Sequence, residues 1–181
     1  MPPIWRTIGP MRQNIVLTGF MATGKTTVGR LLADELDYQW VDTDAVIQRR
    51  HGPIAEIFTN RGEEAFRAME QDLAVELAEQ DGLVISTGGR MMLDPVNAAV
   101  LSGARVFCLT AQPEEIARRI DRPGQPVRPL LEGADPVARI GELLAERAKG
   151  YDRFEQVSTD GRWFSDIVAD LVERLQDEER D

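Results

Sequence analysis

Residues Gly19–Thr26 read GFMATGKT, the most specific motif in the chain. They fit the P-loop pattern G-x-x-x-x-G-K-[ST], whose glycines let backbone N–H groups close around phosphates at a helix N-terminus. The apolar run NIVLTG precedes the motif, and the amphipathic run TTVGRLLADEL follows it. A strand before the loop and a helix after it are what phosphate binding requires, so a chance glycine-rich turn is a poor explanation.

Each residue type in this loop suits a nucleotide. Lys25 would place a positive charge on the β- and γ-phosphates, and Thr26 would bring a hydroxyl to Mg²⁺. The motif therefore predicts ATP as co-substrate together with Mg²⁺. The expected nucleotide contacts from the loop are Gly19, Met21, Ala22, Thr23, Gly24, Lys25, Thr26 and Thr27.

Four further expected strands alternate with helical patterns: YQWVDTD, EQVST and the two continuous apolar runs GLVIST and ARVFCLT. Proline and nearby acidic or capping residues predict helix starts at Pro113 and Pro136, and a helix-rich insertion separates the second and third runs. Continuous apolar runs are typical of parallel strands covered on both faces. The sequence predicts an α/β three-layer sandwich with a five-stranded parallel sheet, of the P-loop NTPase and nucleoside-monophosphate-kinase-like class.

Composition excludes several classes of function. The chain is 43% apolar and 29% charged, with a formal net charge of −10, so it lacks the excess of Lys and Arg that nucleic-acid binding needs. No run approaches the roughly 20 apolar residues of a membrane span, and the first residues lack a signal-peptide core. Cys108 lies in an apolar run and is expected to be a buried core thiol. We expect a cytoplasmic protein with neither nucleic-acid nor membrane partners.

Polar residues at strand ends complete the candidate site. Asp42 and Asp44 lie two residues apart after the second strand, so both carboxylates can face the P-loop, one serving metal and the other substrate. A competing interpretation makes them, Asp44 above all, an N-cap of the next helix. His51, the single histidine, falls in the last turn of that helix before Gly52, and a capping role is favoured over catalysis.

A glycine pair and three arginines need a further reason. Gly88 and Gly89 follow the third strand, where the absence of a Cβ lets main chain approach a ligand. Arg67, Arg128 and Arg147 would by default be surface ion-pair residues. Their position within an ordered pattern argues for a function.

That ordered pattern resembles the shikimate kinase family. The motifs are GKTT, DTD, GEEAFR..E, STGG, RPLL and R...Y, in the family's order and spacing, and they cover about residues 14–175. The resemblance implies transfer of the γ-phosphate of ATP to the 3-hydroxyl of shikimate, a step toward chorismate and the aromatic amino acids. An ordered set of motifs is more specific than any one of its members.

The resemblance implies roles at the substrate end. Asp44 would hold the ring hydroxyls beside the attacking oxygen and assist its deprotonation. Arg67 and Arg147 would clamp the substrate carboxylate, as planar guanidinium forks do. Gly88 and Gly89 would offer backbone contacts to the same small molecule.

It also implies roles at the nucleotide end. Asp42 would act on Mg²⁺ through water, beside Thr26. Arg128 would approach the transferring phosphoryl group and complete a catalytic set with Lys25 and Asp44. Arg119 resembles the residue that flanks adenine.

The expected domain organisation follows from these motifs. Residues 14–181 would form a single P-loop kinase domain after an extra or disordered segment at 1–13, where Met1 or Met11 is the initiator. Residues of about 44–82 would be a substrate-binding helical insertion. Residues of about 120–134, rich in Pro, Gly and Arg, would be a lid. The protein is expected to be a monomer.

Arg90 departs from the family, which usually carries a third glycine at this position. If that glycine serves a positive φ, Arg90 costs about 1 to 2 kcal/mol of backbone strain while its side chain points to solvent. If it turns inward, it adds a third cation near the substrate acid. We expect the outward pose, and the alternatives in function are a kinase of another carboxylated polyol, such as gluconate or quinate, and a non-catalytic ATP-binding module.

Overall fold

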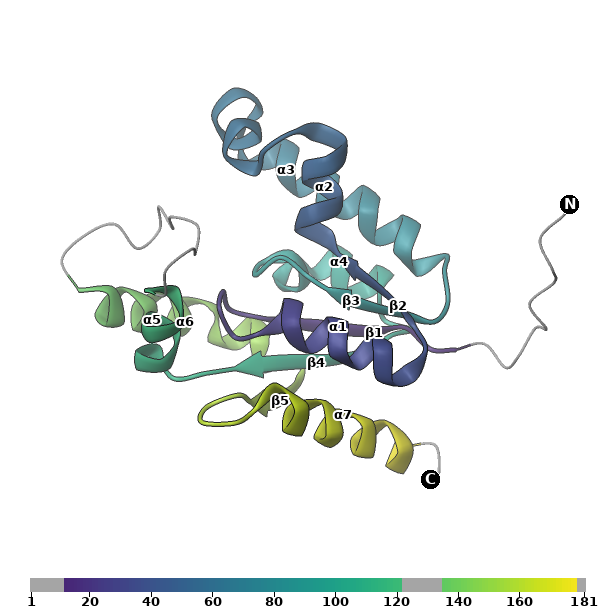
Figure 1. Ribbon diagram of the computed structural model, residues 1–181. Coiled ribbons are helices and arrows are strands. Elements are labelled where there is room, and N and C mark those ends of the chain that lie inside the picture. The colour runs from purple at the N-terminus through teal and green to yellow at the C-terminus, as the bar shows by residue number, and fades with distance from the viewer. Residues whose placement is uncertain (1–11, 122–134, 179–181) are drawn as a thin grey trace, which may run out of the picture.

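The computed structural model describes residues 12–121 and 135–178 (Figure 1). A five-stranded parallel sheet has the order β2-β3-β1-β4-β5. This confirms the predicted α/β class and the number of strands. The strands are β1 Ile15–Gly19, β2 Gln39–Asp42, β3 Leu83–Ser86, β4 Arg105–Thr110 and β5 Glu155–Ser158.

Helices cover both faces of this sheet and give the three layers (Figure 1). Alternate residues of β1 serve the two faces: Leu17 packs with α1 and α7, whereas Val16 packs with α3. α5 and α6 pack together beside Cys108, which is fully buried as predicted. The helices are α1 Lys25–Leu36, α2 Thr43–His51, α3 Ile54–Ala78, α4 Pro95–Val100, α5 Pro113–Ile120, α6 Pro136–Tyr151 and α7 Phe164–Glu178.

The parallel register brings the carboxyl ends of the strands to one edge. Gly19 at the end of β1 lies beside Leu109 of β4, and Asp42 at the end of β2 lies beside Ser86 of β3. The P-loop, the start of α2 and the glycine pair after β3 therefore meet at the same edge. This is the edge at which open α/β sheets bind their ligands.

Helix boundaries show where local patterns mislead. α2 begins at Thr43, and its N-cap is Asp42. α3 runs through a break at Gly62, whose φ is 81°. The short 3-10 helix η1, Met91–Leu93, and α4 were not predicted, although Asp94 followed by Pro95 carries the same start signal that predicted α5 and α6.

His51 is the last residue of α2 and precedes Gly52, whose φ is 91°, as expected of a helix C-terminus. The predicted lid, with Arg128, and most of the predicted N-terminal segment lie outside the described residues. Among the helices of residues 12–121 and 135–178, none is both long and apolar enough to cross a membrane.

Candidate active site

The P-loop is shaped by left-handed backbone at its glycines. Gly19 has φ 129° and Gly24, the N-cap of α1, has φ 100°. The first helical residue is Lys25, whose Nζ donates to the carbonyls of Gly19 at 2.9 Å and Phe20 at 2.7 Å. The lysine charge is thus held over the end of β1, beside the unsatisfied N–H groups of the α1 N-terminus.

Thr26 and Asp42, the residues predicted to serve the metal ion, lie together beside the loop. Thr26 Oγ1 donates to Asp42 Oδ2 at 3.2 Å, while Asp42 Oδ1 accepts from the backbone N–H of Ala45 at 3.0 Å. The competing interpretation as an N-cap therefore holds for Asp42, whereas it was considered above all for Asp44. A hydroxyl and a carboxylate at the phosphate loop fit Mg²⁺, which takes one or two protein groups plus phosphate oxygens and water.

Arg67 lies between two carboxylates of its own helix. Its Nε and Nη2 donate to Glu63 Oε1 at 3.2 and 2.9 Å, and its Nη1 donates to Glu70 Oε2 at 2.6 Å. Burial raises the pKa of the Glu70 carboxyl, an effect that the hydrogen bond and charge of Arg67 partly oppose. Hydrogen bonds from Arg67 lower the pKa of Glu63. Arg67 is therefore fixed in orientation before any ligand binds.

Gly88 lies against the acidic side of the site. Its N–H donates to Thr43 Oγ1 at 3.0 Å. A Cβ at Gly88 would come within 2.6 Å of Asp44 Oδ1 and 3.1 Å of Glu70 Oε1, so a side chain here would have to displace the Asp44 carboxylate. The second oxygen of Glu70, Oε1, is buried and has no hydrogen-bond partner among the described residues. A Cβ at Gly89 would meet its nearest protein atom at 3.6 Å, so the protein itself leaves room there.

Arg147 and Tyr151 close the site from α6. The Arg147 guanidinium lies 5.1 Å from the centre of the Phe20 ring, a cation–π contact. The Tyr151 hydroxyl donates to the carbonyl of Gly89. Burial raises the pKa of Tyr151 to about 12, so this hydroxyl stays protonated and remains a donor.

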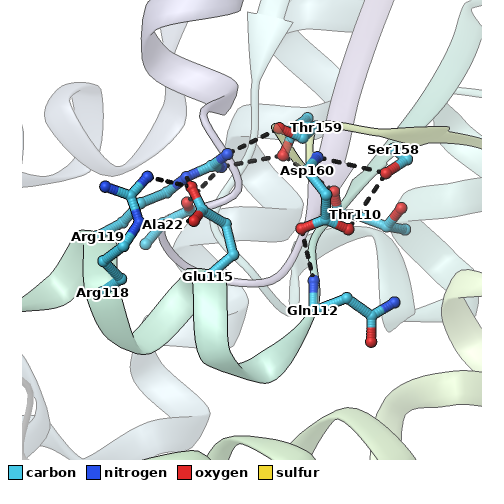
Figure 2. Close-up of polar contacts among 9 residues, drawn as sticks. All are labelled: Ala22, Thr110, Gln112, Glu115, Arg118, Arg119, Ser158, Thr159 and Asp160. Carbon is cyan, nitrogen blue, oxygen red and sulfur yellow. Dashed lines mark hydrogen bonds and ion pairs between the residues drawn. The ribbon is translucent and has the colours of Figure 1, made fainter. Parts of the chain in front are cut away.

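Arg119 joins the P-loop to the segment after β5 (Figure 2). Its Nη1 donates to the Ala22 carbonyl at 3.2 Å and to Thr159 Oγ1 at 2.9 Å, and its Nη2 donates to the Thr159 carbonyl at 2.8 Å. Nε donates to Glu115 Oε1 at 2.6 Å. The guanidinium lies 5.9 Å from the Phe164 ring, so these two planar groups lie together beside the P-loop.

One cavity of about 700 Å³ joins these groups. It brings together most of the residues predicted from the sequence, and it adds Ile54, Phe58, Phe66, Glu70, Thr87, Arg90 and Phe164, which were not predicted as site residues. Gly19 and Thr23 were predicted as nucleotide contacts but do not line the cavity. The buried hydroxyl of Thr23 donates instead to the Phe20 carbonyl at 2.8 Å. Its side chain is therefore unavailable to a nucleotide. The predicted residues on the wall are Met21, Ala22, Gly24, Lys25, Thr26, Thr27, Asp42, Asp44, Arg67, Gly88, Gly89, Arg119 and Arg147.

Sequence comparison identifies the family. Residues 21–176 match the family model described as shikimate kinase. The chain belongs to the shikimate kinase family. A shikimate kinase of Thermus thermophilus is 44% identical over 165 residues, covering 89% of each chain. A shikimate kinase of Symbiobacterium thermophilum is 41% identical over 168 residues, covering 91% of this chain and 97% of the relative.

Solved structures agree with this assignment. The shikimate kinase of Acinetobacter baumannii, in complex with shikimate, superposes with a TM-score of 0.83 at 31% identity over 92% of this chain and 94% of that one. A gluconokinase of Sinorhizobium meliloti shares the fold, with a TM-score of 0.60 at 19% identity. Membership of the shikimate kinase family makes ATP the co-substrate and Mg²⁺ its metal ion.

Proposed function

We propose that this chain transfers the γ-phosphate of ATP to the 3-hydroxyl of shikimate. The supporting observation is that one cavity has Lys25 and Thr26 at one end and Asp44, Arg67 and Arg147 at the other. The first end carries the groups that hold phosphates, and the second carries the groups that recognise a carboxylated polyol. Phosphoryl transfer through a loose transition state mainly requires such positioning and charge neutralisation.

At the substrate end, Arg67 and Arg147 would bind the carboxylate and turn the ring so that one hydroxyl faces the phosphates. Asp44 would accept the hydrogen bond of that hydroxyl and take its proton as the new P–O bond forms. Gly88 and Gly89 would offer backbone groups to the ring, at the place where a side chain on Gly88 would displace Asp44.

At the nucleotide end, Lys25 would leave the carbonyls of its own loop and contact the β- and γ-phosphates. Bound Mg²⁺ would neutralise charge on the phosphate oxygens. Thr26 would hold it directly and Asp42 through water, as the 3.2 Å contact between these two residues suits. Arg119 and Phe164 would border the base.

The roles of residues outside the described ranges rest on the family resemblance alone. Arg128 would meet the transferring phosphoryl group from a lid of about residues 120–134. Residues 14–181 would act as one kinase domain, with residues of about 44–82 as the substrate-binding insertion. We also propose a cytoplasmic monomer, because one chain supplies both ends of the cavity and the cytoplasm supplies ATP.

A coupled assay of ADP release tests the function directly. ADP release from MgATP should depend on shikimate, and gluconate and quinate should give far less at the same concentration. The variant Asp44→Asn should lose most of this shikimate-dependent release while binding nucleotide normally. Release that is independent of shikimate, or faster with gluconate, would overturn the proposed substrate.

A further inference from the structure

Arg90 is tied to the substrate helix. Its Nη1 lies 3.5 Å from Glu63 Oε1, and the two side chains are 54% and 51% exposed. Its φ is −114°, so the positive-φ strain considered from the sequence does not arise. Arg90 lines the same cavity as Arg67 and Arg147, and its half-exposed side chain pairs with Glu63 of α3, so it does not simply point to solvent as expected.

The oxygen that pairs with Arg90 also holds Arg67. Glu63 Oε1 accepts from Nε and Nη2 of Arg67, and Glu70 accepts from Nη1. Among the described residues, these bonds use three of the five N–H hydrogens of the Arg67 guanidinium. One hydrogen remains on each terminal nitrogen and can be donated to a carboxylate.

Arg90 also changes the net charge of the group around Arg67. Arg67 with ionised Glu63 and Glu70 carries a net charge of −1, since one positive and two negative charges are present. Adding Arg90 makes two positive and two negative charges, so the group becomes neutral. An anionic substrate approaches a neutral group more readily than a negative one. Because Arg90 and Arg67 share Glu63 Oε1, the charge of Arg90 also weakens the hydrogen bonds that Glu63 accepts from Arg67.

The ion pair between Arg90 and Glu63 lies where the helical backbone of α3 is interrupted. Glu63 directly follows Gly62, where the helical backbone of α3 is interrupted, so it starts the second part of the helix. Arg90 follows Gly89, whose carbonyl accepts from Tyr151 of α6. The ion pair therefore connects an anchored segment after β3 to the part of α3 that carries Arg67.

We propose that Arg90 is a positioning residue for substrate binding. Through Glu63, it sets the orientation and the effective charge of Arg67 toward the substrate carboxylate. This role rests on the proposed function, in which Arg67 binds that carboxylate. It assigns a task to a residue at which the chain departs from its family.

A double-mutant cycle tests the route through Glu63. Arg90→Ala should raise the KM for shikimate roughly three- to fivefold, the range of an exposed ion pair, with kcat and the KM for MgATP within about twofold of wild type. Arg90→Lys should recover most of the loss. Arg49→Ala, at an exposed position of α2, is the matched control and should change neither constant.

The variant Glu63→Gln supplies the other arm of the cycle. In that background, Arg90→Ala should produce no further rise in KM. A rise that persists undiminished would mean that Arg90 contacts the substrate itself, which overturns the positioning role. A wild-type KM in Arg90→Ala would overturn it as well.

Hydrogen exchange keeps this test separate from the proposed function. Without any substrate, Arg90→Ala should speed amide exchange of residues 62–67 roughly two- to fivefold, because Glu63 loses its ion pair with the segment after β3. If wild-type protein ignores shikimate, the proposed function fails, whereas exchange still reports on the connection. Identical exchange in Arg90→Ala and wild type would overturn the positioning role.

Discussion

Thr26 Oγ1 and Asp42 Oδ2 form a hydrogen bond of 3.2 Å across 16 residues of sequence. The other carboxylate oxygen of Asp42 caps α2 through the N–H of Ala45. One side chain therefore fixes both the start of a helix and the position of a hydroxyl at the phosphate loop. The two tasks can be separated chemically, because an asparagine caps a helix but carries no charge.

Asp42→Asn should weaken the Mg²⁺ dependence of activity while leaving stability nearly unchanged. We expect the Mg²⁺ concentration for half-maximal rate to rise about 10- to 100-fold, the range for loss of a group that orients a metal ligand. The measurement is a Mg²⁺ titration of ADP release at fixed ATP, with a thermal melt of each protein. Asp135→Asn, the same change at the N-cap of α6, is the control. An unaltered titration in Asp42→Asn would remove Asp42 from the metal site.

The two glycines after β3 should respond differently to alanine. Gly88→Ala places a Cβ 2.6 Å from Asp44 Oδ1, so it should displace that carboxylate and lower kcat by at least about tenfold. Gly89→Ala meets protein atoms only at ordinary distances, so it should fold normally and mainly raise the KM for shikimate. Gly103→Ala, where no atom lies within 4 Å, is the control. Equal kinetic effects at Gly88 and Gly89 would contradict the crowding argument.

Arg67→Ala and Arg147→Ala should each weaken shikimate binding by about 1.5 to 3 kcal/mol, the range for hydrogen bonds to charged groups. Calorimetric titration of shikimate into nucleotide-loaded protein measures this loss. Arg67→Ala should also lower the melting temperature, because it leaves the buried Glu70 carboxyl without its partner. Arg139→Ala, at an exposed position of α6, should bind like wild type. Wild-type affinity in both clamp variants would exclude the carboxylate clamp.

Glu115 makes part of the stability dependent on pH. Hydrogen bonds from Arg118 and Arg119 lower its pKa to about 2, below the value of about 4.3 in an unfolded chain. A lowered folded pKa gives stabilisation that is complete above the unfolded value and disappears as the pH falls toward the folded one. Because Arg118 is largely exposed, solvent screening limits the effect to about 1 kcal/mol.

The variant Glu115→Gln should therefore be less stable than wild type in urea near neutral pH, and the difference should shrink as the pH falls from about 5 toward 3. Glu114→Gln, the exposed neighbour on the same turn, is the control. If the stability difference between Glu115→Gln and wild type grew as the pH fell, folding would raise the pKa of Glu115 rather than lower it.

Local sequence patterns predicted the strands and the P-loop well. Each of the five strands was placed within about three residues of its observed ends. The inner strands β1, β3 and β4 are short apolar runs, because burial on both faces leaves a plain signal in sequence. The P-loop was identified because its glycines and lysine have few other uses in that order. The N-cap could not be settled between Asp42 and Asp44 from the sequence, because both residues fit the cap pattern and the choice depends on where α2 begins.

Pairings across the fold could not be predicted in the same way. Glu63 and Arg90 lie on different elements, and nothing near either residue signals the other. Phe164 packs against Gly24 through a contact between α7 and the P-loop that only the folded chain creates. The pairing of Glu70 with Arg67 could have been predicted, since the two residues have the i,i+3 spacing of helical partners. The burial of Glu70, which raises its pKa and makes it unusual, is a property of the packed structure.

Lys25→Ala should abolish turnover without unfolding the protein. The side chain is only half-buried, and it donates to two loop carbonyls that water can satisfy in its absence. During transfer, however, the ammonium group would be a fixed positive charge on the phosphates, and loss of one such group costs about 100-fold or more in kcat. The measurement is ADP release at saturating MgATP and shikimate, with circular dichroism and a thermal melt to establish folding. The chain offers a matched control in its other lysine, because Lys149 is exposed on α6 and Lys149→Ala removes the same charge away from the cavity. Activity of Lys25→Ala within about tenfold of wild type, or an equal loss in Lys149→Ala, would show that the lysine charge does not act on the transferring phosphate.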